Sequence, residues 1–190
     1  MGVLTLKKNQ ISLLDDIIMR LDSFGKIEAQ EGDVYFITQA LYEACEAVKF
    51  GNRGIGAVLA KENVVLAKGS NGIKDKNNLM RHVAHAEIMA MHNYSQKLGH
   101  SPDNLLNTTM YTTLEPCIMC ACSMLHLRVG EVVTAIPAPN SGAILTHIDA
   151  LKSMKAWKSN IDKYQIKYRL AKIPNELKEL CLEIYHLGKM

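Results

Sequence analysis

The sequence predicts one α/β domain, a sandwich of helices packed on a sheet in which some strands pair in parallel. Its 190 residues are enough for a single domain with a normal-sized core. Helical and strand-like segments alternate through the middle of the chain, a pattern typical of parallel strands joined by helices. Hydrophobic residues make up 48% of the chain and no stretch has low complexity, so we expect a globular protein.

Two amphipathic helices are expected before the first strand. Residues 12–21 have apolar side chains at helical spacing, with Ser12 as the N-cap and Gly25 beyond the end. The expected buried face consists of Leu13, Leu14, Ile17, Ile18 and Leu21. Residues 33–50 form the second helical pattern, which Gly51 ends. Its expected buried stripe consists of Phe36, Ala40, Leu41, Ala44, Ala47 and Val48.

The rest of the chain alternates strands and helices. Two apolar runs rich in Val and Ile, residues 54–60 and 63–68, predict a β-hairpin joined at residues 61–62. The pattern further predicts helices over 85–98, 117–128 and 174–187, strands over 108–114, 131–136 and 163–170, and a loop over 137–142. We assign residues 1–30 to an N-terminal helical extension and residues 31–190 to the main domain, including the C-terminal strand and helix.

The cysteines point to metal or redox chemistry. The chain has five, and three of them lie within six positions: Cys117, Cys120 and Cys122. An odd count with such crowding does not resemble the disulfide framework of a secreted protein. Cys45 and Cys181 lie within apolar helical patterns and are interpreted as small core residues.

Two segments, each at the start of a predicted helix, could hold one metal ion. His85 opens one helix, and Cys117 and Cys120 follow Pro116 at the start of the other. Residues three apart share one face of a helix, so both thiolates can meet one ion. The helix N-terminus also stabilises thiolate over thiol. A catalytic Zn²⁺ takes three imidazole or thiolate ligands and leaves its fourth position to water, and this set meets that requirement.

Glu87 is the candidate proton carrier. It lies two residues after His85, which would place the two side chains on nearly opposite sides in mid-helix. If the helix tip points end-on at the metal, one side chain can bind zinc while the other faces the substrate. Zinc lowers the pKa of bound water toward ~7, and an adjacent unligated carboxylate can move protons to a ring nitrogen and to a departing amine.

The motif H-x-E followed by P-C-x-x-C, here at residues 85–87 and 116–120, resembles the signature of the zinc deaminases of bases and nucleosides. The resemblance implies a Zn²⁺ cofactor, with the histidine and both cysteines of the motif as ligands and Glu87 as catalytic proton shuttle. It also implies the cytidine deaminase-like fold, a three-layer α/β/α sandwich with a mixed central sheet.

The similarity continues outside the motif. Further segments, among them residues 110–115, are similar to the branch that contains tRNA adenosine deaminases and cytosine and guanine deaminases. By this resemblance Asn71 contacts the base, and the backbone around Ala57 and Ala86 lines the substrate pocket. The similar region covers about residues 33–136. The resemblance also implies a homodimer.

Departures from this branch affect the expected substrate. Residues 54–57 lack the proline that relatives often have before Gly-Ala in the first strand, and residues 137–143 keep only Gly-Ala of a run shared by the tRNA enzymes. The formal net charge of +3 is small for a dedicated nucleic-acid binder, and the C-terminus has no Arg/Lys cluster. These features favour a free base or nucleoside.

The sequence therefore predicts a zinc-dependent hydrolytic deaminase that converts an exocyclic amine of a nucleobase or nucleoside to a carbonyl and releases ammonia. A tRNA adenosine-to-inosine deaminase is the close alternative. A noncatalytic, zinc-bound partner subunit is a further alternative, and Glu87 argues against it because a silent partner has no need of a proton shuttle.

Other conspicuous residues have simpler interpretations. His82 precedes a predicted helix in a polar loop and is interpreted as a solvated surface histidine. Cys122 points away from Cys120 on a helix, so we expect it to be buried rather than a fourth ligand. Trp157 with Lys155 and Lys158 could stack on a nucleotide, but a partly buried Trp beside solvated lysines explains the trio equally well.

The N-terminal sequence shows no sign of membrane targeting. Residues 1–20 include Lys7, Lys8, Asp15 and Asp16, and these charges leave neither the apolar centre of a signal peptide nor a membrane span. We therefore expect no membrane partner and a cytoplasmic protein.

Overall fold

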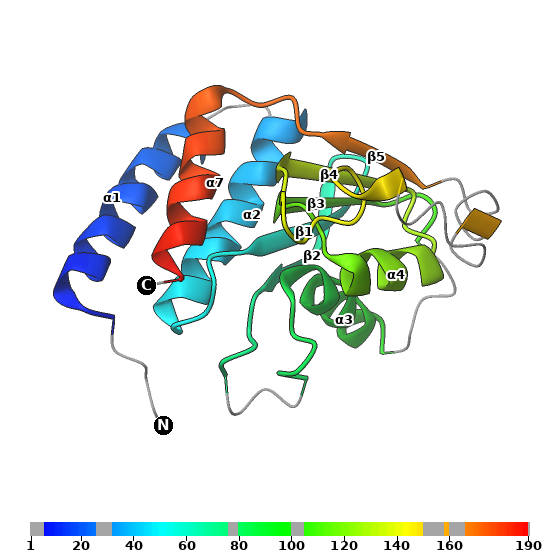
Figure 1. The fold of residues 1–190 in the computed structure, drawn as a ribbon, viewed down its shortest axis with the longest axis horizontal. Coiled ribbons are helices and arrows are strands. Elements are labelled where there is room, and N and C mark those ends of the chain that lie inside the picture. Colours follow the sequence, from blue (N-terminus) through cyan, green and yellow to red (C-terminus); the bar gives the residue numbers. More distant parts are fainter. Residues whose placement is uncertain are drawn as a thin grey trace.

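The structure, a computed structural model, describes residues 6–25, 32–75, 80–99, 105–149, 158–159 and 166–189, and within them it contains a sheet of five strands with helices on both faces (Figure 1). The strands are β1 (Gly56–Lys61), β2 (Val64–Ser70), β3 (Thr109–Leu114), β4 (Glu131–Ile136) and β5 (Lys167–Leu170). Their order across the sheet is β2-β1-β3-β4-β5. β1 is antiparallel to both β2 and β3, whereas β3, β4 and β5 are parallel, which confirms the mixed sheet.

Helices form the two outer layers. α1 (Lys8–Gly25), α2 (Gly32–Lys49) and α7 (Asn175–Leu187) lie together on one side of the sheet, and α3 (Ala86–Leu98) and α4 (Ile118–His126) lie on the other (Figure 1). No helix in the described part of the chain is long and apolar enough to cross a membrane.

Side chains of one strand alternate between two apolar cores. On β1, Val58 and Ala60 belong to the core shared with α1, α2 and α7, whereas Ala57 and Leu59 belong to the core shared with α3 and α4. Successive strand residues point to opposite faces, so a sheet covered on both faces needs apolar residues at every position. This alternation confirms the predicted three-layer α/β/α sandwich.

Most predicted elements are found within a few residues of their expected bounds. α2 buries all six residues of its predicted stripe. The hairpin turn lies at residues 62–63 instead of 61–62, because Lys61 still pairs with Val64, and Glu62 takes a positive φ of 54°. The last helix begins one residue late, at Asn175. The predicted start of the last strand, residues 163–165, lies outside the described residues.

The first helix is longer than predicted, and Ser12 is not its N-cap. α1 begins at Lys8, where the Gln10 side chain reaches back to accept a hydrogen bond from Lys7 N at 3.0 Å and so caps an earlier turn. Leu14, Ile17 and Leu21 are buried as expected, but Leu13 is 49% exposed. The three buried residues join the core with α2 and α7. The boundary at residue 30 stays a prediction.

The loops that contain the predicted catalytic residues, or lead into them, lie at one end of the sheet. We call this end the site end. Gly56 at the start of β1 pairs with Ser70 at the end of β2, and Leu114 at the end of β3 pairs with Ile136 at the end of β4. β1 and β3 are antiparallel, so the start of β1 also lies beside the end of β3. The described segments at this end are residues 50–55, 71–75, 80–85, 115–117 and 137–146.

Candidate metal centre

His85 lies at the N-terminal tip of α3. It is the N-cap residue, with an extended backbone at φ −72° and ψ 153°. Gly72 N donates to Ala84 O at 2.9 Å, which ties the end of β2 to the residue before His85. α3 also packs directly on β2, because a Cβ on Gly69 would lie 2.3 Å from Ala86 O. The helix tip is therefore held against the sheet on both sides of His85.

Cys117 and Cys120 lie at the tip of α4. Cys117 is the N-cap, with φ −73° and ψ 171°, and Cys120 is buried in the first turn. The carbonyl of Cys117 accepts a helical hydrogen bond from Ala121 N at 2.9 Å. α4 ends at His126, two residues before the predicted end, and Arg128 takes a positive φ of 57°.

The ligand atoms of the three residues are close enough to share one metal ion. His85 Nδ1 lies 3.6 Å from Cys117 Sγ and 3.5 Å from Cys120 Sγ, and the two sulfurs are 3.8 Å apart. A tetrahedral ion with Zn–S bonds of about 2.3 Å and Zn–N bonds of about 2.0–2.1 Å separates two sulfurs by about 3.8 Å and a sulfur from a nitrogen by about 3.6 Å. The donor set and its spacing therefore fit Zn²⁺. Within the described residues no other group of His, Cys, Asp and Glu has such a geometry.

Hydrogen bonds within this group already stabilise one thiolate. The hydrogen bond from Cys120 lowers the pKa of Cys117 to about 3, with a further contribution from His85. The hydrogen bond to Cys117, together with burial, raises the pKa of Cys120, and the hydrogen bond to Cys117 raises the pKa of His85. Zinc binding replaces protons on such ligands. The centre is thus a site for a cation that can displace the proton of Cys120 and bind beside the Cys117 thiolate.

Glu87 lies beside the group without being one of its three ligands. It is in the first turn of α3, is 3% exposed, and its charge contributes to the raised pKa of Cys120. Burial raises the pKa of Glu87 itself, and the positive charge of His85 opposes that effect only in part. The tip of α3 therefore brings an imidazole and a carboxylate to one place, as an end-on helix would.

The residues predicted to contact substrate lie around the same centre. Ala57 and Ala86 are fully buried and belong to the apolar core that contains Cys120. Asn71 follows β2 at the site end, is 4% exposed, and accepts a hydrogen bond at Oδ1 from Ile73 N at 3.4 Å. Their contact with a substrate stays a prediction.

The residues given simpler interpretations are outside the metal group. His82 is exposed, as expected. Cys122 is also exposed, so its predicted burial is wrong: it lies on the solvent side of α4, whose inner side carries Cys120. Trp157 and Lys155 lie outside the described residues, and Lys158 is exposed.

Glu115, to which the sequence pattern assigned no role, is only 3% exposed at the end of β3. Its carboxylate accepts hydrogen bonds from the 137–146 segment, including Leu145 N at 2.7 Å and Thr146 N at 2.8 Å. A carboxylate directly after an apolar strand could have signalled this arrangement, because a buried charge must have partners.

Arg53 is a second residue that the sequence pattern did not single out. It is exposed in the 50–55 segment at the site end. The hydrogen bond to Cys117 raises the pKa of His85, and the positive charge of Arg53 is close enough to lower that pKa in part. The neighbouring Gly54 has no room for a side chain, since a Cβ there would lie 2.1 Å from Ile184 O of α7. The backbone beside Arg53 is therefore held against α7 while the guanidinium faces solvent.

The model of the cytidine and deoxycytidylate deaminase zinc-binding region matches residues 30–136, more than half of the chain. The chain belongs to this deaminase family. The matched region runs from the start of α2 to the end of β4 and includes His85, Glu87, Cys117 and Cys120. The family's zinc-binding region and the zinc-like spacing of the three ligand atoms together make Zn²⁺ the cofactor of this deaminase-family chain.

Relatives of this deaminase-family chain include tRNA-specific adenosine deaminases. The chain is 37% identical over 105 residues to that of Buchnera aphidicola, a match that covers 54% of this chain and 60% of the relative. It is 30% identical over 120 residues to that of Aquifex aeolicus, covering 63% of this chain and 76% of the relative. A solved structure from work on tRNA:A34 deaminases has a TM-score of 0.64 at 26% identity and covers 79% of this chain and 98% of that one. The match thus spans less than two thirds of the Buchnera protein.

Proposed function

We propose that this chain is a zinc-dependent hydrolytic deaminase that converts an exocyclic amine of a nucleobase to a carbonyl and releases ammonia. The observation that carries the proposal is the juxtaposition of the His85, Cys117 and Cys120 ligand atoms with the buried carboxylate of Glu87 at the tips of α3 and α4. Zinc held by these ligands would supply Lewis-acid chemistry and lower the pKa of a water molecule at the open position.

The chain's own residues would move the protons and hold the base. Glu87 takes one proton from the attacking water and gives it to the ring nitrogen; it then takes the second proton of that water from the added hydroxyl and delivers it to the amine as the C–N bond breaks. One C–O bond forms, one C–N bond breaks, and water and amine become carbonyl and ammonia. Asn71, at the site end, would hydrogen-bond the base, and the backbone around Ala57 and Ala86 would line the pocket for the ring.

Adenosine within tRNA is the substrate that the relatives support. The named relatives at 30% and 37% identity are tRNA-specific adenosine deaminases. The exposed guanidinium of Arg53 at the site end is suited to a phosphate of an RNA backbone. We also propose that the protein forms a homodimer, as its resemblance to this branch of deaminases implies.

A free base or nucleoside is the second candidate, and a specific observation favours it. The 137–146 segment lies next to the metal centre, and it keeps only Gly-Ala of the run shared by the tRNA enzymes. The chain's net charge of +3 also provides little general attraction for RNA.

Ammonia release by purified protein of known zinc content tests the proposal. The substrates are adenine, guanine, cytosine, their nucleosides and an RNA anticodon stem-loop, with Glu87→Gln as the paired variant. We expect turnover of the stem-loop, seen by mass spectrometry as conversion of adenosine to inosine, and loss of that turnover in Glu87→Gln with zinc retained. Light scattering of the same sample reports whether it is a dimer.

Each result has a distinct meaning. Turnover of a free base or nucleoside only would move the substrate to the second candidate. Full activity in Glu87→Gln would contradict the assigned proton carrier, and zinc-replete protein without turnover of any substrate would favour a noncatalytic partner subunit.

A further inference from the structure

The segment after β4 is attached to the metal centre through one buried side chain. Glu115 is the last residue before Pro116 and Cys117, and its own backbone N donates to Ile136 O at 2.9 Å. The chain leaves β4 at Ile136 and passes over this point. We call residues 137–146 the covering loop.

The Glu115 carboxylate collects donors from both ends of the covering loop. Oε2 accepts Ala138 N at 3.0 Å and also the Thr146 hydroxyl. Oε1 accepts three successive backbone N–H groups, from Ile144 at 3.1 Å, Leu145 at 2.7 Å and Thr146 at 2.8 Å. Burial raises the pKa of Glu115, but these donors outweigh burial and hold that pKa below its usual value. One ionised side chain thus closes the loop.

The covering loop is shaped to admit this carboxylate. A Cβ on Gly142 would lie 2.2 Å from both the carboxyl carbon and Oε2 of Glu115. Only glycine leaves space for the carboxylate at that position. Within the loop, Gly142 N and Ser141 N both donate to Ala138 O, at 2.7 and 3.1 Å, and so turn the chain back over Glu115.

The same loop is bonded to the segment that carries two of the metal ligands. Ala143 N donates to Pro116 O at 3.0 Å, directly before the ligand Cys117. Ala143 and Ile144 are 4% and 2% exposed and belong to the apolar core that contains Cys120. Any shift of the loop relative to Glu115 therefore changes the surface next to the ligands without removing a ligand.

We propose that Glu115 is a positioning residue that determines which bases the centre accepts, by fixing the covering loop beside the zinc ligands. The proposal rests on the proposed deaminase function. Glu115 does not touch the reacting atoms: it acts through the backbone of residues 138–146. The ligands among which the covering loop selects are the rings of purine and pyrimidine bases, either free or within RNA.

A double-mutant cycle on the zinc-loaded protein tests the proposal. The variants are Glu115→Gln, Gly142→Ala, their combination, and Glu131→Gln as the control carboxylate at the other end of β4. Gln keeps the size of Glu115 but can accept at only one end, so Ala138 N or the three consecutive N–H groups lose their acceptor. The readouts are zinc content, amide hydrogen exchange of Ile144, Leu145 and Thr146, and kcat and KM for every substrate of the panel.

We expect both single variants to retain zinc, to speed exchange of the three amides by at least about tenfold, and to change the ratio of kcat/KM between two substrates by about tenfold, mainly through KM. The combined variant should be non-additive, because both substitutions disturb the same contact between the carboxylate and the loop. Glu131→Gln should match wild type in all three readouts.

Two results would overturn the proposal. Faster amide exchange with unchanged ratios of kcat/KM between substrates would make Glu115 a purely structural anchor. Additive effects of Glu115→Gln and Gly142→Ala would show that the two residues do not act through the same contact. If wild type turns over nothing, the proposed function fails separately, and equilibrium dialysis of adenosine, guanine, cytidine and the stem-loop against zinc-loaded wild type and Glu115→Gln then decides: unchanged ratios of affinity reject the positioning role.

Discussion

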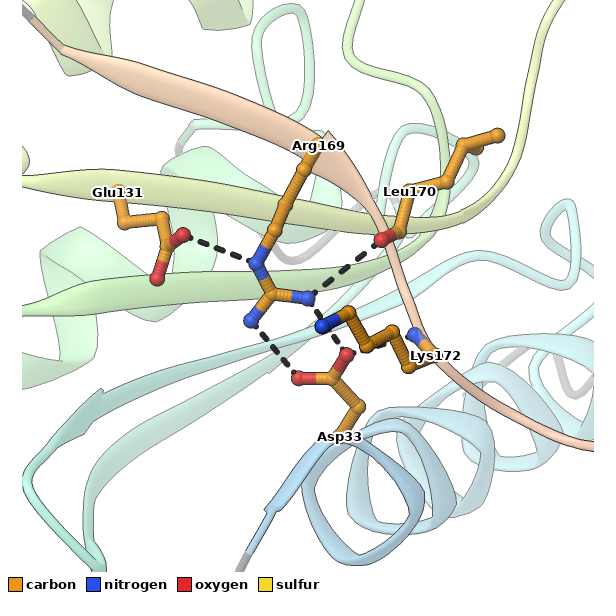
Figure 2. Close-up of polar contacts among 5 residues, drawn as sticks. All are labelled: Asp33, Glu131, Arg169, Leu170 and Lys172. Atoms are coloured by element: carbon orange, nitrogen blue, oxygen red, sulfur yellow. Dashed lines mark hydrogen bonds and ion pairs between the residues drawn. The ribbon is translucent and has the colours of Figure 1, made fainter.

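Asp33, at the start of α2, is joined to Arg169 of β5 by two hydrogen bonds, from Nη1 to Oδ2 at 2.5 Å and from Nη2 to Oδ1 at 2.9 Å (Figure 2). Arg169 Nε also donates to Glu131 Oε1 at 2.9 Å, and Lys172 N donates to Asp33 Oδ2 at 2.6 Å. Asp33 is only 9% exposed whereas Arg169 is 35% exposed. This cluster connects the last strand of the sheet to α2, which packs on β1 and β3.

Replacing Asp33 by Asn should weaken the dependence of the free energy of unfolding on pH in the acidic range. Burial raises the pKa of Asp33, but the hydrogen bonds from Arg169 and Lys172 outweigh burial and lower it below the usual value. A carboxyl group whose pKa is lower in the folded state than in the unfolded state stabilises the fold at pH values above its unfolded-state pKa of about 3.9. This contribution to the free energy of unfolding is lost as the pH falls through the folded-state pKa. We expect Asp33→Asn to reduce the free energy of unfolding by about 1–3 kcal/mol at pH 7.

Urea unfolding from pH 7 down to pH 3 measures this dependence. The difference between wild type and Asp33→Asn should shrink below about pH 4. Asp16→Asn, which removes the exposed partner of Arg20, is the control and should have a much smaller effect. A difference that stays constant down to pH 3 would mean that ionisation of Asp33 is not the cause.

Removing a ligand should remove the metal. Cys120→Ala is expected to lower zinc affinity by more than about 100-fold, because only two protein ligands remain. Cys122→Ala on the same helix is the matched control, since that thiol is exposed and outside the group. Zinc content by atomic emission and thermal unfolding with and without chelator distinguish the two. Equal zinc loss in both variants would contradict the ligand set.

Glu87→Gln should strongly reduce turnover and leave the zinc group intact. A positioned general acid or base contributes about 10²–10⁴-fold, so kcat should fall by that factor while zinc stoichiometry stays unchanged. Gln keeps the size of the buried side chain, so folding should be preserved. Asp75→Asn, another change of a carboxylate to its amide near the site end, is the control and should leave kcat near the wild-type value.

Arg53→Ala should weaken binding of RNA and leave binding of a free base unchanged. Loss of one cationic contact with a phosphate should raise KM for the stem-loop by about 3–10-fold at low salt, and the difference should narrow as salt rises. Lys61→Ala at the opposite end of β1 is the matched control. An equal rise in KM for a free nucleoside would show that Arg53 acts on the base pocket instead.

Gly69→Ala should disturb α3 and, with it, the tip that carries His85 and Glu87. Its Cβ would lie 2.3 Å from Ala86 O and 2.3 Å from Ala90 N, both of them backbone atoms, so helix and strand must separate. We expect destabilisation of about 1–3 kcal/mol and reduced zinc affinity. Gly99→Ala at the other end of α3 meets no atom within 4 Å and costs only the strain of a φ of 74°, so it should retain zinc.

Local pattern was sufficient to predict most of the fold. The stripe of α2 and the apolar runs of β1, β3 and β4 are spaced by the geometry of their own elements and are buried as expected, whereas the edge strands β2 and β5 are largely half-buried or exposed. The failures are also local: an unforeseen cap by Gln10 lengthened α1, and Cys122 faces solvent because the inner face of α4 is already defined by Cys120.

The sequence by itself determined the chemistry of the centre. Residue type and the spacing within each of the two segments indicated a zinc site, and the resemblance to the zinc deaminase signature assigned the roles. His85, Cys117, Cys120 and Glu87 could therefore be named before the structure was known. The tertiary structure alone decided how far apart their atoms lie, since α3 and α4 meet only through the packing of both helices on one face of the sheet.

Only the tertiary structure could identify the partners of Glu115 and the place of Arg53. The donors to Glu115 come from residues 138–146, and these reach it because parallel β3 and β4 end side by side. Arg53 reaches the neighbourhood of His85 because β1 and β2 are antiparallel, so Gly56 at the start of β1 pairs with Ser70 at the end of β2, and the Gly72–Ala84 hydrogen bond holds His85 near that end. Such contacts depend on strand order and direction, which local periodicity does not encode, because the pattern of a strand is the same whichever neighbour it pairs with.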